Sequence, residues 1–202
     1  MNRTFLFLMT GAFLLILGMG VPAMAGEPTQ QIKQTTDKIL SILADSNLKN
    51  PSRAQERKQW VSQAIGERFD WEELARRSLA QHWAQRTPDE KKEFIQLYRE
   101  LLERTYLNKV QDYSGETVRY EGENIESDYA TVKVRILTAK NTEISVDYRV
   151  MKKENHWLVY DISIEGVSLV NNYRSQFNSI LQKSTYEELV KKLKEKSLTE
   201  KP

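Results

Sequence analysis

The stretch that most constrains the fold covers residues 157–177, because the spacing of its apolar residues changes partway along. Residues 157–164 contain two interleaved apolar sets, Trp157 and Val159 in one, and Leu158, Tyr160, Ile162 and Ile164 in the other. Beyond Gly166, apolar residues recur every three to four positions from Leu169 to Leu181. A period of two is typical of a strand, and a period near 3.6 is typical of a helix. The stretch therefore predicts a strand that is apolar on both faces and turns at Gly166 into an amphipathic helix.

The first 25 residues have the composition of a secretory signal peptide. Arg3 precedes an apolar run over residues 5–17, and Ala23-Met24-Ala25 matches the small-x-small cleavage pattern. The run is short for a membrane span, and no cysteine follows it as a lipidation site. We expect residues 1–25 to be removed and residues 26–202 to form one exported domain.

Composition limits both the cross-links and the partners of this domain. The chain has no cysteine, so a hydrophobic core must stabilise it without disulfides. Its formal net charge of +2 gives no reason to expect binding to nucleic acid or to an anionic membrane.

Helical periodicity dominates residues 30–113. Helices are predicted over residues 30–48 and 52–68, after Asp70, and from Thr87 to about residue 113. Asp70 with Glu73 and Thr87 with Glu90 have the spacing of capping boxes.

Alternating patterns follow over residues 117–165. Strands are predicted over residues 117–120, 130–136, 144–150 and 157–164, with turns at Asn141-Thr142 and Glu154-Asn155. C-terminal helices are predicted over residues 167–197, the last capped by Ser184 with Glu187. This order predicts an α+β fold in which helices cover one face of a curved antiparallel sheet of about four strands.

No residue spacing predicts catalysis or a metal site, and we expect neither a cofactor nor a metal. His82 and His156 have no partner nearby in the sequence. Tyr160 and Asp161 could form a proton-transfer pair, although an aspartate in a strand is more often a hydrogen-bonding residue. Arg174 could bind an anionic group or pair with Asp161 or Glu165.

Several residue clusters resemble the MlaC family, also called the toluene-tolerance auxiliary family. The resemblance extends over about residues 32–193 and is carried by Phe69-Asp70-Trp71, Ala75-Arg76, Leu79, Trp83, Trp157, Val159-Tyr160-Asp161, Gly166-Val167-Ser168-Leu169-Val170 and Tyr173-Arg174-Ser175-Gln176-Phe177. Ala80 departs from the family, which usually has glycine at that position.

This resemblance implies a monomeric periplasmic carrier of diacyl phospholipid. The implied partners are the MCE-domain component of an inner-membrane ABC transporter and an outer-membrane lipoprotein–porin complex, and the implied role is to maintain outer-membrane lipid asymmetry. The implied fold is a twisted sheet with helices, a cystatin/NTF2-like cone around an apolar cavity.

From the apolar sets of neighbouring strands and the residues that close them, we predict the cavity wall. It consists of Leu102, Tyr106, Val132, Val134, Ile136, Ile144, Val146, Tyr148, Trp157, Val159, Val167 and Leu169. We also expect the helix after Gly166 to shift against residues 157–164 when lipid enters or leaves.

Two other functions and some details of transport stay open at this level. One is an NTF2-like enzyme that acts on a small apolar substrate through Tyr160 and Asp161. The other is an adaptor with a filled core that binds only proteins. The direction of transport, the head group and a different cargo such as a hopanoid also stay open.

Overall fold

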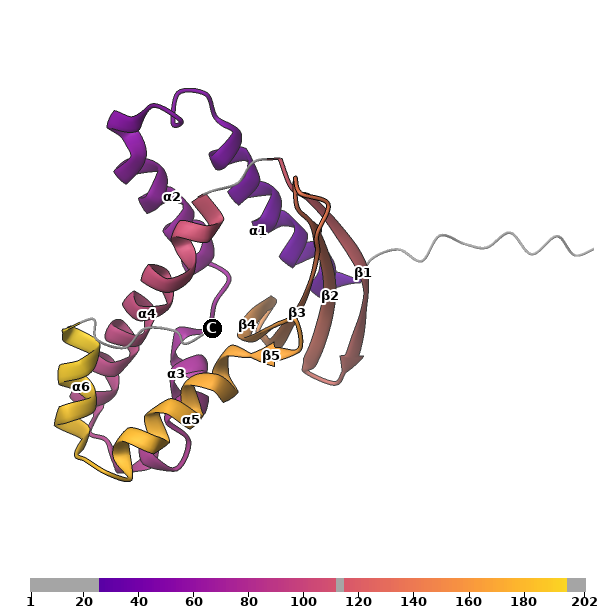
Figure 1. The fold of residues 1–202 in the computed structure, drawn as a ribbon. Helices are drawn as coiled ribbons and strands as arrows, with labels where there is room; N and C mark the ends of the chain where they lie inside the picture. The colour runs from indigo at the N-terminus through magenta and orange to yellow at the C-terminus, as the bar shows by residue number, and fades with distance from the viewer. Residues whose placement is uncertain (1–25, 112–114, 196–202) are drawn as a thin grey trace, which may run out of the picture.

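The computed structural model describes residues 26–111 and 115–195 and contains a helical layer beside an antiparallel sheet (Figure 1). The predicted signal peptide lies outside the described residues. Within them, the helices are α1 (Glu27–Ala44), η1 (Pro51–Arg53), α2 (Ala54–Gly66), α3 (Trp71–Leu79), η2 (Ala80–Gln85), α4 (Pro88–Gln111), α5 (Leu169–Leu181) and α6 (Tyr186–Lys194). The strands are β1 (Thr117–Glu126), β2 (Tyr129–Leu137), β3 (Glu143–Lys153), β4 (His156–Ile164) and β5 (Val167–Ser168). The α+β fold class is confirmed.

The sheet has the strand order β1-β2-β3-β4-β5, and every neighbouring pair is antiparallel. Both predicted turns are confirmed, with Asn141 and Glu154 at positive φ. β1 extends well beyond the predicted residues 117–120, and a register shift lies between Tyr120 and Gly122. That irregularity interrupts the alternation from which the sequence prediction was made.

Helix ends agree with the sequence in one case and differ in detail in three. Thr87 and Glu90 form the predicted capping box, since each backbone N–H donates to the other residue's side chain. Asp70 caps α3 at 3.0 Å from Glu73 N, but the Glu73 side chain bonds arginines instead of reaching back. The residue that caps α6 is Thr185, one position beyond the predicted Ser184. The first helix ends at Ala44 instead of residue 48.

An aromatic cluster forms the core of the helical layer. Tyr98 of α4 lies with its ring centroid 5.3 Å from those of Tyr173 and Phe177 of α5, in edge-to-face contacts. Phe94 is fully buried beside them. Such contacts join large buried areas with favourable ring geometry, so α3, α4, α5 and α6 pack as one unit.

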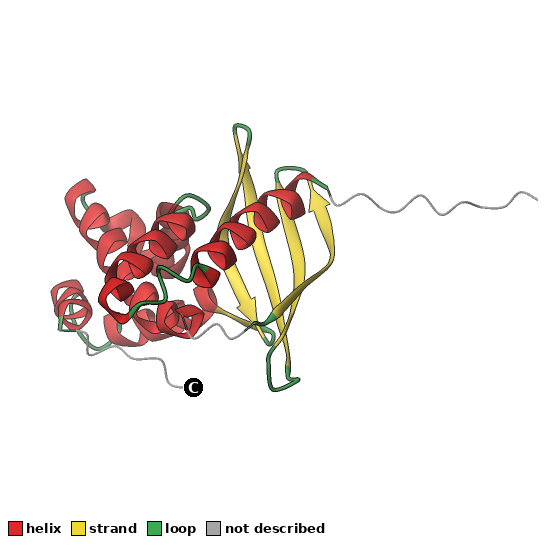
Figure 2. Cartoon of the chain, turned by 90° about the horizontal axis from the view of Figure 1, so that it is seen from above, coloured by secondary structure: helices red, strands yellow, loops and turns green. Residues whose placement is uncertain are grey.

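Helix α1 leaves this layer and lies across the face of the sheet that is turned toward the helices (Figure 2). Its first turn is fixed to β1, because Glu123 accepts hydrogen bonds from Thr29 N at 2.7 Å and Thr29 Oγ1 at 2.6 Å. Ile32, which is 2% exposed, packs from α1 onto the sheet.

Residues 68–70 connect the two layers along the second edge of β4. Asp70 N donates to Val159 O, and Val159 N donates to Arg68 O, both at 2.9 Å. The Arg68 side chain also donates to Gln31 Oε1 at 2.6 Å and to Trp157 O at 3.0 Å. One half-buried arginine therefore ties α1 to β4.

None of the helices in the described ranges is both long and apolar enough to cross a membrane.

Candidate functional site

A β-bulge in β4 decides which residues face the helices. Asp161 is opposite Arg149 and Val159 is opposite Val150, so Tyr160 has no residue of its own across the ladder. Tyr160 and Asp161 consequently lie on the same outer face. Beyond the bulge, Ile162 pairs with Tyr148 and is on the inner face with Val159. Ile164 likewise pairs with Val146, so the expectation that Ile162 and Ile164 lie on the face opposite Trp157 and Val159 was wrong.

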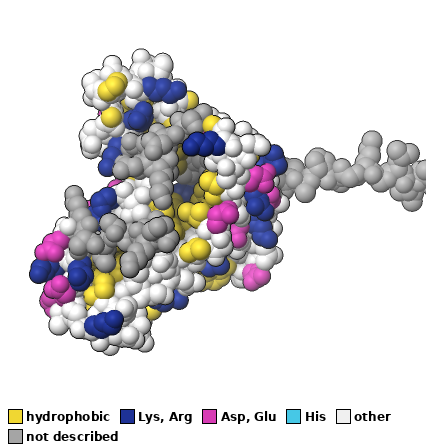
Figure 3. Space-filling view, in the orientation of Figure 1, with side chains coloured by type: hydrophobic (Ala, Val, Ile, Leu, Met, Phe, Trp, Pro, Cys, Tyr) yellow, Lys and Arg dark blue, Asp and Glu magenta, His cyan; other side chains and the backbone are white. Residues whose placement is uncertain are grey.

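The inner face of the sheet has a buried part and a partly exposed part. The buried part packs with Ile32 of α1 and contains Ala130, Val132, Val134, Val146, Val150, Trp157 and Val159. The partly exposed part, called here the open wall, consists of Val118, Tyr120, Ile136, Ile144, Tyr148 and Ile162. Figure 3 shows hydrophobic side chains gathered in the hollow between the sheet and the helices.

Tyr148 of β3 is a partly buried member of the open wall. Burial raises its pKa to about 12, yet its side chain keeps accessible surface. A group that is surrounded by protein and still accessible is what the wall of an internal hollow requires. Tyr120 is near Tyr148, and its buried Oη has no partner in hydrogen-bond geometry. The wall is thus mostly apolar with two phenols.

The structure brings together most of the predicted cavity wall. The eight sheet residues Val132, Val134, Ile136, Ile144, Val146, Tyr148, Trp157 and Val159 all belong to the inner face. Leu102 and Tyr106 are in the helical core instead, and Leu169 is buried at the start of α5. Val167 is the first residue of β5 and is 58% exposed, so its side chain does not close an enclosed space.

Sequence reasoning missed three residues of the open wall. Val118 and Tyr120 are in β1, and their alternation with Thr117 and Arg119 could have identified an inner face. No pattern could have identified Ile162, since strict alternation places it on the wrong face.

Asp161 anchors a helix, in agreement with the structural alternative for this residue. Its Oδ2 is 3.0 Å from Arg149 Nη1 and accepts from Ser168 Oγ at 2.7 Å, while Oδ1 accepts from Val170 N at 3.1 Å. Both oxygens are therefore occupied at the N-terminus of α5. Tyr160 projects onto the outer face, away from the hollow, where the Arg77 guanidinium lies 4.1 Å from its ring centroid.

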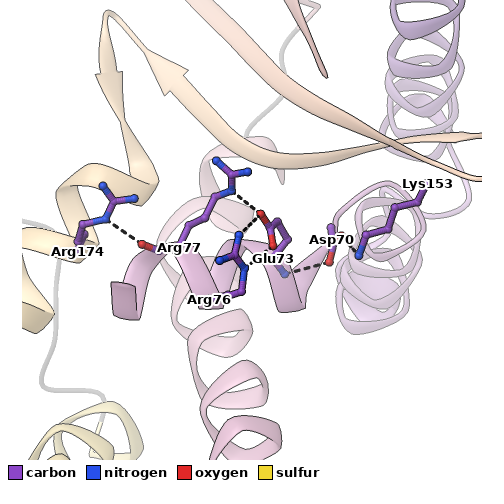
Figure 4. Close-up of polar contacts among 6 residues, drawn as sticks. All are labelled: Asp70, Glu73, Arg76, Arg77, Lys153 and Arg174. Carbon is purple, nitrogen blue, oxygen red and sulfur yellow. Dashed lines mark hydrogen bonds and ion pairs between the residues drawn. The ribbon is translucent and has the colours of Figure 1, made fainter. Parts of the chain in front are cut away.

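Arg174 pairs with neither of the predicted carboxylates. Its Nε donates to the backbone oxygen of Arg77 at 2.8 Å (Figure 4). His82 lies 3.1 Å from Asn178 Oδ1, and no group of side chains within the described ranges has the composition of a metal site.

Two known proteins are similar to this chain over most of its length. The first is the intermembrane phospholipid transport system binding protein MlaC of Haemophilus influenzae, 20% identical over 173 residues that cover 83% of this chain and 81% of that protein. The second is a phospholipid-binding protein from Ralstonia solanacearum, solved in complex with a phospholipid. It is 28% identical, with a TM-score of 0.75 over 84% of this chain and 96% of that one.

The sequence profile described as MlaC protein matches residues 33–195. That match includes β1–β5 and every helix from α2 onward, so it covers the open wall and the elements that position it. The chain belongs to the MlaC family.

Proposed function

We propose that this protein is a periplasmic carrier that binds a diacyl phospholipid with its acyl chains against the open wall. The observation that carries the proposal is the division of the inner face. One part is sealed by α1, and the other leaves six large apolar or aromatic side chains accessible in the hollow. The phospholipid bound to the Ralstonia solanacearum relative supports the choice of ligand.

The size of the transfer free energy explains why a lipid needs such a carrier. Burying one methylene stabilises by about 0.8 kcal/mol, so two chains with roughly 30 carbons favour an apolar environment by on the order of 20 kcal/mol. Unassisted escape into water is negligible on that scale. A hollow lined by apolar side chains replaces most of the contacts that the membrane provided, while the head group can stay in water.

The route of transport rests on the family. We propose that the carrier exchanges phospholipid with the MCE-domain component of an inner-membrane ABC transporter and with an outer-membrane lipoprotein–porin complex. Net direction then depends on those partners, because a carrier with equal affinity at both membranes sets no direction.

Mass spectrometry of lipid extracted from the purified protein tests the function. A phospholipid near one molecule per protein would support the carrier and identify its head group. A hopanoid in the extract would identify a cargo other than phospholipid. A lipid-free protein would favour the adaptor, and a small apolar molecule converted on incubation would favour the enzyme.

A variant in the open wall tests the site. Val146 is 5% exposed, so a charge there would test the fold rather than the hollow. Ile136 is partly exposed, and Ile136→Glu places a carboxylate where acyl chains would lie. We expect a folded protein that purifies with at least tenfold less lipid.

Thr131→Glu is the matched control for this variant. It adds the same charge to the same strand, but on the outer face and opposite Arg149. If Ile136→Glu keeps the wild-type amount of lipid, the acyl chains bind elsewhere.

A further inference from the structure

We propose that the surface where α3 and α5 meet the outer side of β2, β3 and β4 docks an acidic segment of a partner protein. The surface consists of Arg76, Arg77, Arg149, Arg174, Tyr129 and Tyr160, and is called here the arginine–tyrosine patch. The inference rests on the proposed function, because a carrier that exchanges lipid has to meet proteins at each membrane. It extends that function by naming a surface separate from the hollow.

One carboxylate holds two of the arginines. Arg76 donates from Nε and Nη2 to the two oxygens of Glu73, each at 2.7 Å, and Arg77 donates from Nε to Glu73 Oε1 at 2.6 Å (Figure 4). These bonds lower the pKa of Glu73 to about 2, so it stays charged at any working pH. Two guanidinium groups therefore share one negative charge.

Two tyrosine rings form the floor of the patch. The Arg77 guanidinium carbon lies 4.1 Å from the ring centroid of Tyr160 and 5.9 Å from that of Tyr129. The two rings meet edge to face at 5.8 Å. Tyr129 is nevertheless 43% exposed, which leaves an aromatic surface available among the cations.

The other two arginines extend the positive charge along the same surface. Arg149 pairs with Asp161 at 3.0 Å and acts electrostatically on Tyr160. Arg174 donates Nε to Arg77 O, so it adds a cation without a carboxylate. Three of the four guanidinium groups pair with carboxylates, two of them with Glu73 and one with Asp161. The neighbouring pair Lys153 and Asp70 is balanced.

The fixed positions of these arginines favour a protein partner over a membrane surface. A planar guanidinium held by a carboxylate or a carbonyl presents its remaining N–H groups in a set direction, which suits carboxylate side chains. Attraction to an anionic bilayer needs only mobile charge, for which flexible lysines suffice. Arginine and tyrosine are also the residues that contribute most at protein interfaces.

The tyrosine floor of the patch and the open wall lie on opposite faces of the sheet. Tyr129 and Tyr160 project outward, while the open wall faces the helices. A partner bound at the patch would therefore hold the carrier without covering the lipid.

A fluorescent decaglutamate peptide is the probe, with binding to the purified protein measured by anisotropy. We expect binding that weakens strongly as NaCl rises from about 50 to about 300 mM, because screening reduces exposed charge attraction. Arg76→Glu and Tyr129→Ser should each weaken binding at least fivefold. Arg76 is 50% exposed and Arg77 keeps Glu73, so the first variant retains the fold.

Lys191→Glu is the matched control, since Lys191 is 60% exposed on α6 and the substitution changes charge equally. Binding that falls as much for Lys191→Glu, or that is unchanged in both patch variants, would overturn the proposal. So would patch-dependent binding to phosphatidylglycerol vesicles without peptide binding. The amount of lipid extracted from the same preparations tests the carrier function separately. A failure of the docking proposal can therefore be told apart from a failure of the carrier proposal.

Discussion

At the scale of single residues, Ala80 has a strained backbone conformation, at the position where the sequence departs from the family pattern. It lies at φ 49° and ψ −120° at the start of η2, directly after α3, in a conformation that residues with a Cβ rarely adopt. The resemblance to the MlaC family placed glycine at this position, and glycine adopts positive φ without steric penalty. Trp83 follows in the short helix η2.

Ala80→Gly should therefore stabilise the protein. Relief of a strained backbone is worth of order 1–3 kcal/mol, and the added flexibility of the unfolded chain offsets about 0.5–1 kcal/mol of it. Urea unfolding should show a higher midpoint at an unchanged slope. Ala84→Gly in η2, where no positive φ requires glycine, is the control and should destabilise. A lower midpoint for Ala80→Gly would contradict the strain.

At the scale of elements, periodicity predicted which segments form helices and strands but not where patterns break. The inner faces of β2 and β3 could be read from alternation, because neither strand has an internal bulge. β4 could not, since the bulge at Tyr160 moves Ile162 to the inner face. Bulges depend on how a partner strand is held, and that information is spread over distant residues. The packing of Leu102 in the helical core also depends on contacts with residues distant in the sequence.

Helix α5 and strand β4 form a single unit in the structure, which disfavours the expected shift between them. Asp161 holds the N-terminus of α5 through Ser168 and Val170. At its other end, α5 is locked by the aromatic contacts of Phe177 with Tyr98.

Hydrogen exchange tests this arrangement. In the wild type, amides of α5 and β4 should exchange with the same opening free energy, because they open together. Asp161→Asn should destabilise by roughly 2 kcal/mol or more, since Arg149 loses its carboxylate, and should speed exchange in α5 first. If α5 opens at a lower free energy than β4 in the wild type, the result would support a shift of α5 against β4.

At the scale of the whole molecule, the proposed lipid site predicts that the loaded state is the more stable one. Apolar surface exposed in an empty hollow costs free energy that a bound lipid removes. A ligand that binds only the folded state at a hundredfold excess over its Kd stabilises by about 2.7 kcal/mol. We therefore expect bound lipid to contribute to the stability of this protein.

Removing the lipid should lower the melting temperature by several degrees, because 1 kcal/mol shifts Tm by about 2–4 °C in a domain of this size. Calorimetry before and after extraction, followed by reloading from phospholipid vesicles, makes the measurement. Ile136→Glu should show no change on extraction. Equal melting temperatures for stripped and loaded wild type would mean that the hollow closes without lipid.

The two edges of the sheet differ in a way that bears on how the protein behaves when concentrated. Residues 68–70 and β5 pair with the outer edge of β4, whereas β1 has no strand beyond it in the described part of the chain. β1 carries Arg119 and Glu121, and its register breaks at Gly122. Charges and a bulge on an exposed strand hinder pairing between copies. We therefore expect this edge to resist pairing between the sheets of neighbouring copies at high protein concentration.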